Sequence, residues 1–475
     1  MSPRLRGLLL ALLLWPNKSI QVNLSRALRL TPITTPLSQI GRGAEGEGGV
    51  AFVGAGGKTT ALFALARELV PRHKSVILTA TTHLGAWQVA QAGRHIIAKT
   101  TADLNELPDT GVTLVTGPLE GGRTQPVSQQ VLFWLHENTK SRAIPLLIEA
   151  DGARQKPLKA PAAHEPPIPD FVDTVIVVAG LSGLGKPLTD EFVFRAGRFR
   201  ELCHPSRPIV EPDMLVRVLC HPEGGLKNMP PSATRIALLN QAETPELLSV
   251  GGKMANDLLG HFDSILVGSL QQNEFQAFER TAGIILAAGE SKRYGGPKQL
   301  LDWKGRPFVR QVAETAFHAG LWPVIVVTGF RAADVEAALD GLPVSIVRND
   351  EWQSGQGLSI AAGVRGLAKN TGAAIFLLAD QPQIPVEVIQ ALVENHTQNL
   401  PAILAPLVLN EKRANPVLFD RGTFPDLLRL TGDIGGRAIF DKHKVEYLPW
   451  HDDALLLDVD TPEDYERLKN LISPS

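Results

Sequence analysis

Glycine, cationic and aspartate residues in the second half of the chain have the types and spacing that phosphate chemistry needs. The apolar residues Ile284–Leu286 predict a buried strand, which leads into a loop of small residues followed by Arg293, Gly295-Gly296 and Lys298. A glycine-rich turn after a strand offers backbone N–H groups to phosphate oxygens, and cations beside it neutralise their charge. We therefore expect a nucleoside triphosphate to bind at this loop.

Two aspartates, Asp380 and Asp460, complete the predicted site. Each follows an apolar stretch that we expect to form a strand, so the two side chains can converge at one edge of a sheet. Mg²⁺ takes oxygen ligands, of which typically one or two are protein carboxylates. In this arrangement Arg293 would hold the phosphates, and Lys298 would offset the charge that grows on the α-phosphoryl group.

Each of these features also has a structural interpretation. An aspartate after a strand often caps a helix or turn, and Asp460-Thr461-Pro462 is typical of a helix start. Cations in a loop are usually solvated. The order and spacing of the whole set favour catalysis, with Arg293, Lys298 and Asp380 as catalytic residues and with Asp380 and Asp460 as metal ligands.

A second glycine loop, Gly54–Thr60 (GAGGKTT), lies between an apolar stretch and a helical pattern near the start of the chain. The full phosphate-binding pattern G-x-x-x-x-G-K-[ST] needs glycine at position 52, where this chain has Phe52, so only the core of the pattern is matched. Here we expect the lysine to reach terminal phosphates and the threonine to bind Mg²⁺. The alternative is a tight turn that caps a helix. The predicted nucleotide-binding residues are Gly54, Gly56, Gly57, Lys58 and Thr59.

Two further segments fit a nucleotide site in this half. The apolar stretch 146–148 ends in Glu149 and Asp151, as the acidic strand of an NTPase does. Asn240 lies where GTPases carry an Asn-Lys-x-Asp loop that reads the base. Because Gln241 and Glu243 depart from that pattern, the base stays open between ATP and GTP.

Apolar stretches that predict strands alternate with amphipathic stretches along the chain. They lie at 50–53, 76–78, 146–148, 175–178, 236–239, 265–267, 284–286, 324–327, 344–347 and 375–378. This alternation predicts α/β domains with mostly parallel sheets. The polar residues after 270 separate two halves, so we predict an N-terminal extension (1–24), a first domain (25–270), a linker (271–281) and a second domain (282–475).

Composition excludes several classes of protein. The formal net charge of -2 over 475 residues argues against a general nucleic-acid binder. Two cysteines, Cys203 and Cys220, exclude a disulfide scaffold and fit a reducing compartment, so we expect a cytoplasmic protein. The apolar run 8–15 is too short to span a bilayer and lacks a cleavage pattern, so we interpret it as part of an extension and expect no membrane partner.

Five segments of the second half resemble the MobA-like nucleotidyltransferases, in particular the molybdenum cofactor cytidylyltransferases. They are LAAGESKRYGGPKQLL, NDEWQSGQGLSIAAGV, LLADQP, NPVLF and DVDTPED, spread over 282–475. The resemblance implies a GT-A-like (Rossmann-like) α/β/α fold and Mg²⁺-dependent transfer of CMP from CTP to Mo-molybdopterin, which gives molybdopterin cytosine dinucleotide and pyrophosphate.

The same resemblance assigns further site residues. Backbone groups of Ala287, Ala288 and Gly289 would hold the nucleotide. Gly357 and Ser359 would lie near the base or ribose, and Asn415 would face the acceptor pocket. The guanylyl branch resembles LAGG, and the extra methyl of Ala288 favours a pyrimidine, although such a difference discriminates by only about 10–200-fold.

The first half resembles a family of selenium-dependent molybdenum hydroxylase accessory proteins, the YqeC-like proteins, over roughly 25–270. The segments that carry this are GAGGKTT, IEADGARQKPLKAP, HEPPIPDFVDTVIVVAGL and HPEGGLKN. The resemblance implies a P-loop-like three-layer α/β/α domain that binds a nucleotide and serves a molybdenum hydroxylase client. Lys156, Lys159 and His164 would contact a phosphorylated ligand, or else be solvated.

The sequence thus predicts a two-domain fusion for molybdenum cofactor maturation that acts on small molecules. Two alternatives stay open. One is a transferase for another phosphorylated acceptor, such as a sugar or polyol phosphate. The other is a cofactor-binding chaperone without catalysis.

Overall fold

The computed structural model describes residues 22–30, 49–104, 107–291, 293–408 and 412–470. Most of the expected N-terminal extension and Lys292 lie outside these residues. The chain divides into an N-terminal unit, Gln21–Phe278, and a C-terminal unit, which begins at Glu279. In the segment 271–281, which we expected to be a linker, only the residues up to Asn273 form a turn. From Glu274 it belongs to one strand, β13 (Glu274–Ala287).

The N-terminal unit is built on a parallel sheet of eight strands, ordered β3-β4-β2-β7-β1-β9-β11-β12. All six stretches expected as strands in this half are strands. The bounds are β1 (Val50–Gly54), β2 (Ser75–Ala80), β3 (Arg94–Ile97), β4 (Gly111–Thr116), β7 (Leu146–Glu149), β9 (Thr174–Gly180), β11 (Thr234–Asn240) and β12 (Ser264–Ser269), with the short strands β5 (Leu119–Glu120), β6 (Arg123–Thr124), β8 (Leu158–Lys159) and β10 (Val193–Phe194) outside this sheet.

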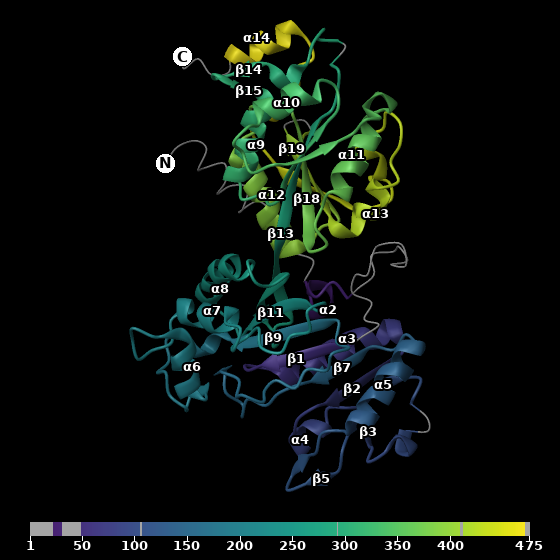
Figure 1. The fold of residues 1–475 in the computed structure, drawn as a ribbon, viewed down its shortest axis with the longest axis vertical. Coiled ribbons are helices and arrows are strands. Elements are labelled where there is room, and N and C mark those ends of the chain that lie inside the picture. Colours follow the sequence, from purple (N-terminus) through teal and green to yellow (C-terminus); the bar gives the residue numbers. More distant parts are fainter. Residues whose placement is uncertain (1–21, 31–48, 105–106, 292, 409–411, 471–475) are drawn as a thin grey trace. The chain divides into compact units, whose positions relative to one another are not determined.

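Helices cover this sheet because strand side chains alternate between its two faces. Ala51 and Val53 of β1 belong to one buried cluster with residues of the helices α5 to α8. The long helix α3 packs on β1, β2, β4 and β7 (Figure 1). The bounds are α2 (Leu24–Ala27), α3 (Lys58–His73), α4 (Ala86–Val89), α5 (Gln129–Ser141), α6 (Ala196–Cys203), α7 (Pro212–Cys220) and α8 (Pro245–Leu258).

The C-terminal unit has a mixed sheet in the order β17-β16-β13-β18-β21-β19-β22, with β20 beside β19. Strands β17, β16, β13 and β18 are parallel, whereas β21 is antiparallel to β18 and β19. The bounds are β16 (Val324–Thr328), β17 (Ser345–Arg348), β18 (Thr371–Leu378), β19 (Ile403–Val408), β20 (Lys412–Arg413), β21 (Val417–Asp420) and β22 (Val445–Pro449), with a hairpin of β14 (Asp302–Trp303) and β15 (Arg306–Pro307).

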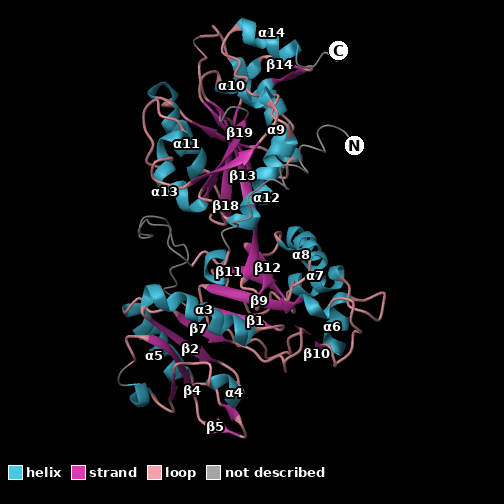
Figure 2. Ribbon diagram, turned by 180° about the vertical axis from the view of Figure 1, so that it is seen from behind, coloured by secondary structure: helices cyan, strands magenta, loops and turns pink. Residues whose placement is uncertain are grey.

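This second sheet lies between two layers of helices (Figures 1 and 2). Ile285 of β13 packs in a cluster with residues of α9, α10 and α12, and the neighbouring Ile284 packs with residues of α11 and α13. One strand therefore supplies both cores, and its carboxyl end is held rigidly where the loop of small residues begins. The bounds are α9 (Phe308–His318), α10 (Ala332–Ala338), α11 (Gln356–Arg365), α12 (Val386–Asn399), α13 (Phe424–Leu427) and α14 (Pro462–Asn470).

Candidate nucleotide sites in the two units

In the C-terminal unit, the carbonyl groups at the start of the loop are held by hydrogen bonds. Phe330 N donates to Ala288 O at 3.1 Å, and Gln299 Nε2 donates to Ala287 O and Gly289 O at 3.4 and 3.3 Å. The N–H groups of Ala288 and Gly289 have no hydrogen bond to any described residue. The loop is therefore fixed through its carbonyls, and two donors stay open to a ligand.

Lys298 joins the two predicted metal ligands. Its Nζ lies 2.8 Å from Asp380 Oδ2 and 2.8 Å from Asp460 Oδ1, and its side chain is 11% exposed. Burial opposes the ammonium charge, but the two carboxylates outweigh burial and raise the pKa of Lys298. The lysine is thus a cation at any physiological pH. The Lys298 ammonium nitrogen thus contacts both aspartates, although Asp460 lies 162 positions away in the sequence.

Asp460 reaches this site by a route that the sequence did not indicate. The residues directly before Asp460 are not a strand. They form a short 3₁₀-helix, Asp453–Leu456, followed by an irregular segment. The helix that starts after Asp460 is capped by Thr461, whose Oγ1 accepts from Asp464 N at 3.2 Å, and Asp464 Oδ2 accepts in turn from the backbone N–H groups of Asp460 and Thr461. The Asp460 carboxylate is therefore not the cap. The Arg293 side chain is 85% exposed, and its Nη1 lies 3.9 Å from Asp460 Oδ2. This side chain has room to turn toward a ligand.

A third aspartate, Asp458, was missed by sequence reasoning. Its Oδ1 accepts from Gln381 Nε2, and burial together with the charge of Asp380 raises its pKa. The buried Gln381 Oε1 has no hydrogen-bond partner among the described residues. The signal that was available is the alternation in DVD, which puts Asp458 on the same side of an extended segment as Asp460.

The two residues expected near the base or ribose are held by hydrogen bonds within the protein. Asn349 Nδ2 donates to Ser359 Oγ at 2.9 Å, and Gly357 N donates to Gly432 O at 3.0 Å. A Cβ on Gly355 would lie 2.2 Å from Gly432 C, so the segment 431–436 packs directly on the start of α11. This TGDIGG segment was also missed, although its glycines were the available signal. Asn415 lies between β20 and β21.

In the N-terminal unit, the glycine loop leaves a run of donors open. Three N–H groups are used internally: Gly54 donates to Asp151 Oδ2 at 3.0 Å, Ala55 to Val178 O at 2.8 Å, and Gly56 to Lys156 O at 3.0 Å. The next four N–H groups, of residues 57–60, have no hydrogen bond to a described residue. They begin the 16-residue helix α3, where the helix dipole also favours an anion.

The glycines of this loop cannot be exchanged for other residues. Gly56 has φ +79°, and a Cβ there would lie 2.3 Å from Gly180 N. Asn240 fixes the loop from another side, because its Nδ2 donates to Gly56 O at 2.7 Å and its Oδ1 accepts from Leu270 N at 3.0 Å. Asn240 is buried, and these two hydrogen bonds make it a support of the glycine loop.

The acidic end of β7 meets the start of α3. Thr59 Oγ1 donates to Glu149 Oε2 at 2.7 Å and accepts from Gln88 Nε2 at 2.8 Å. Burial raises the pKa of Glu149. Lys58 Nζ donates to Gly54 O at 2.7 Å and lies 3.2 Å from Asp151 Oδ1. The lysine, threonine and carboxylates predicted for this site are therefore in contact.

Beyond Asp151 runs a chain of alternating charges, which we call the ion-pair chain: Lys58, Asp151, Lys159, Glu165 and Arg195. Lys159 Nζ lies 2.8 Å from Asp151 Oδ2 and 2.9 Å from Glu165 Oε2, and Arg195 Nη1 lies 2.7 Å from Glu165 Oε2. Burial opposes ionisation of Glu165, but Arg195 and Lys159 outweigh it and lower its pKa to about 2. Lys159 is neither solvated nor open to a ligand, contrary to both expectations. His164 is exposed, and Lys156 Nζ donates to Glu191 O at 2.7 Å.

Among the residues that the structure describes, no helix has the length and apolar character needed to cross a membrane. No group of three or more His, Cys, Asp or Glu residues in the same ranges is arranged to hold a metal ion.

Comparison with known proteins assigns the two units. A family model described as YqeC protein matches residues 50–197, and one described as MobA-like NTP transferase domain matches residues 283–447. Nicotine blue oxidoreductase of Paenarthrobacter nicotinovorans is 34% identical over 197 residues, which cover 39% of this chain and 95% of that protein. The YqeC protein of Escherichia coli (strain K12) is 30% identical over 47% of this chain and 88% of its own length.

A third relative is purine catabolism protein PucB of Bacillus subtilis (strain 168), 32% identical over 40% of this chain and 97% of its own length. Each relative is thus matched over nearly its full length by a part of this chain. The chain belongs to both families, as a fusion of a YqeC protein with a MobA-like NTP transferase domain.

Proposed function

We propose that the C-terminal unit is a Mg²⁺-dependent CTP:molybdopterin cytidylyltransferase. The observation that carries the proposal is Lys298, held by Asp380 and Asp460, next to Gln299, whose side chain contacts the loop with open N–H groups. A cation and two carboxylates beside a phosphate cradle suit attack on an α-phosphorus. Base choice rests on Ala288, and the acceptor rests on the molybdenum cofactor resemblance.

The reaction forms a bond between the terminal phosphate oxygen of the acceptor and the α-phosphorus of CTP, and it breaks the bond to the leaving pyrophosphate. Ala288 and Gly289 bind phosphate oxygens through N–H groups, and Arg293 turns onto the outer phosphates. Lys298 offsets the charge that develops on the α-phosphoryl oxygens. Asp380 and Asp460 would hold Mg²⁺, which would neutralise part of the charge of the triphosphate.

We expect purified protein with Mg²⁺ and molybdenum-loaded molybdopterin to release pyrophosphate with CTP, and to do so at least tenfold more slowly with GTP or ATP. A coupled pyrophosphate assay measures the rate, and mass spectrometry identifies the cytosine dinucleotide. Release with CTP and a sugar or polyol phosphate would point to the alternative acceptor. Binding of molybdopterin without any release would point to the chaperone alternative.

We also propose that the N-terminal unit has a P-loop-like fold and binds the phosphates of ATP or GTP, in support of a molybdenum hydroxylase client. The supporting observations are the four open N–H groups of residues 57–60 and the contact of Thr59 with Glu149. A threonine hydroxyl and a carboxylate at such a loop are the usual neighbours of a nucleotide-bound Mg²⁺.

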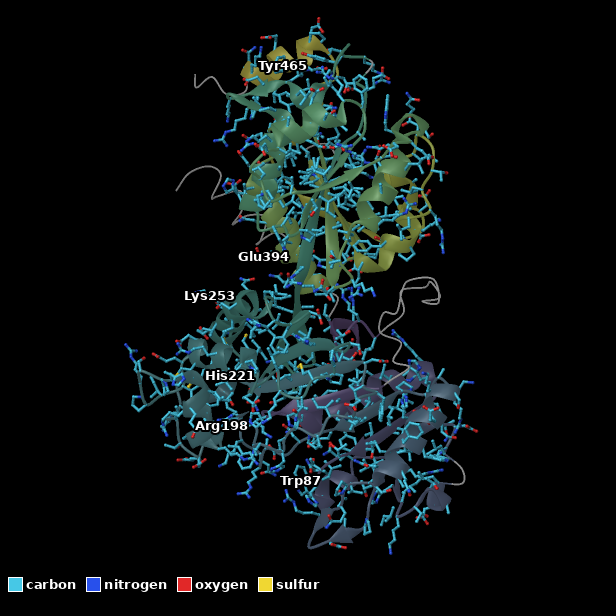
Figure 3. The ribbon with its side chains drawn as sticks, in the orientation of Figure 1. Trp87, Arg198, His221, Lys253, Glu394 and Tyr465 are labelled. Carbon is cyan, nitrogen blue, oxygen red and sulfur yellow. The ribbon has the colours of Figure 1, made fainter. Side chains whose placement is uncertain are left out.

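Replacing Lys58 with methionine is expected to weaken nucleotide binding at this site at least tenfold, because it removes the cation of the glycine loop itself. Titration with fluorescent ATP and GTP analogues measures the dissociation constants. Lys253→Met on α8, where Figure 3 labels this exposed lysine, is the matched control and should bind as the parent does. Equal binding by the Lys58 variant would count against the site.

A further inference from the structure

Each carboxylate assigned to the metal contacts the same protein cation through one of its oxygens. Asp380 Oδ2 and Asp460 Oδ1 each lie 2.8 Å from the same Lys298 Nζ. Mg²⁺ requires its oxygen ligands at about 2.0–2.1 Å. An ion that contacts both of these oxygens would share them with the ammonium group at a distance where the two cations repel each other, so Lys298 and the metal compete for this pair of oxygens.

The residues present suit a divalent metal once the lysine has moved. Carboxylate oxygens are hard ligands of the kind that Mg²⁺ and Mn²⁺ prefer, and the buried Gln381 Oε1, without a partner among described residues, lies in the same cluster through Asp458. Two protein carboxylates leave most of an octahedral shell unfilled. Phosphate oxygens of a bound nucleotide can fill positions that otherwise hold only water, so the nucleotide would strengthen metal binding here.

The lysine needs another anion if it is to leave the carboxylates. Its side chain is almost buried, and a buried ammonium group without a partner is costly. The triphosphate is such an anion, and it has a docking point of its own in the open N–H groups of Ala288 and Gly289 and in the exposed Arg293. Nucleotide binding can therefore draw Lys298 off the carboxylates.

We propose that Lys298 is a placeholder for the metal ion, so that the metal enters the C-terminal site only together with the nucleotide. This proposal rests on the proposed function, because it takes a triphosphate as the ligand of the loop. It adds an order of binding and gives Lys298 a second role. Without nucleotide the lysine neutralises Asp380 and Asp460, and with nucleotide it exchanges places with the metal.

Mn²⁺ binding to the full-length protein, followed by electron paramagnetic resonance of the free ion, tests the exchange. In the parent we expect a non-hydrolysable CTP analogue to tighten Mn²⁺ binding at least tenfold. In Lys298→Met, Mn²⁺ alone should bind at least tenfold more tightly than it binds to the parent, because the carboxylates are free. The double variant Lys298→Met/Asp380→Asn defines the Mn²⁺ bound elsewhere, including the N-terminal unit, and is subtracted.

Two controls separate charge from folding. Lys298→Arg keeps a cation beside the carboxylates and should bind Mn²⁺ alone as weakly as the parent. Lys369→Met removes an exposed lysine of the same unit and should change nothing. Far-UV circular dichroism checks the fold of each variant.

Either of two results would overturn the placeholder role: Mn²⁺ binding by Lys298→Met no tighter than by the parent, or full-strength Mn²⁺ binding by the parent without nucleotide. Failure of the proposed function looks different. In that case CTP releases no pyrophosphate, while the Lys298→Met variant still gains affinity for Mn²⁺ in the absence of nucleotide.

Discussion

The Asp380→Asn variant is expected to lose nucleotidyl transfer by on the order of 10³-fold in kcat while it keeps the fold of the C-terminal unit. The substitution keeps the shape of the side chain and removes one of the two carboxylates around Lys298. A metal ligand acts on charge that develops in the transition state, and removing one such electrostatic contribution costs several kcal/mol of barrier. The pyrophosphate assay with CTP and saturating Mg²⁺ measures the loss.

The matched control is Asp340→Asn, an exposed aspartate of the same unit, which should keep kcat within about twofold. Thermal unfolding separates chemistry from folding, because Lys298 keeps Asp460 as a partner and we expect little loss of stability. A kcat of the Asp380→Asn variant within threefold of the parent would remove Asp380 from the metal site. It would also favour an acceptor or mechanism other than the one proposed.

Strands and their loops could be predicted from the sequence because they depend on local patterns. Ile284–Leu286 lies at the carboxyl end of β13, and the stretch before Asp380 forms β18. Parallel pairing of those two strands then brings their carboxyl ends together, so the neighbourhood of Asp380 and the loop follows from topology. The chain from Asp453 to Asp460 has no such pattern, and its path depends on packing that no short motif encodes.

Partners of the polar side chains were harder to predict than the positions of the strands. A helix starts after Asp460 as expected, but Thr461 caps it, and the Asp460 carboxylate contacts Lys298 instead. Asn240 supports the glycine loop, because its amide bonds with Gly56 and Leu270. A side chain with several possible partners is decided by which of them the fold brings within about 3 Å. Sequence spacing does not contain that information for residues far apart in the chain.

The ion-pair chain is the clearest case of polar partners that sequence spacing does not predict, and it leads to the largest expected effect on stability. Lys159 and Arg195 come from different segments, and the pairing of β8 with β10 brings these segments side by side. Lys159→Met is expected to destabilise the N-terminal unit by about 3 kcal/mol, because it removes a buried partner from two buried carboxylates. The loss stays at the low end of the range for broken buried pairs, since Lys58 and Arg195 remain. Urea unfolding with hydrogen exchange at β1 and β9 measures it.

Acid dependence distinguishes loss of this charge from simple loss of packing. Because the folded-state pKa of Glu165 is about 2, below the ordinary 4.5, its contribution to stability is complete above pH 4.5 and is lost as the pH falls toward 2. Lys159→Met removes part of the cause of that depression, so the parent and the variant should converge in stability as the pH falls through this window. Lys156→Met, which loses one hydrogen bond to a backbone carbonyl, should cost less than about 1 kcal/mol and show no convergence. A difference between the parent and the Lys159 variant that is independent of pH would assign the effect to packing of the methylene chain, and the ion-pair chain would then not be what stabilises this loop.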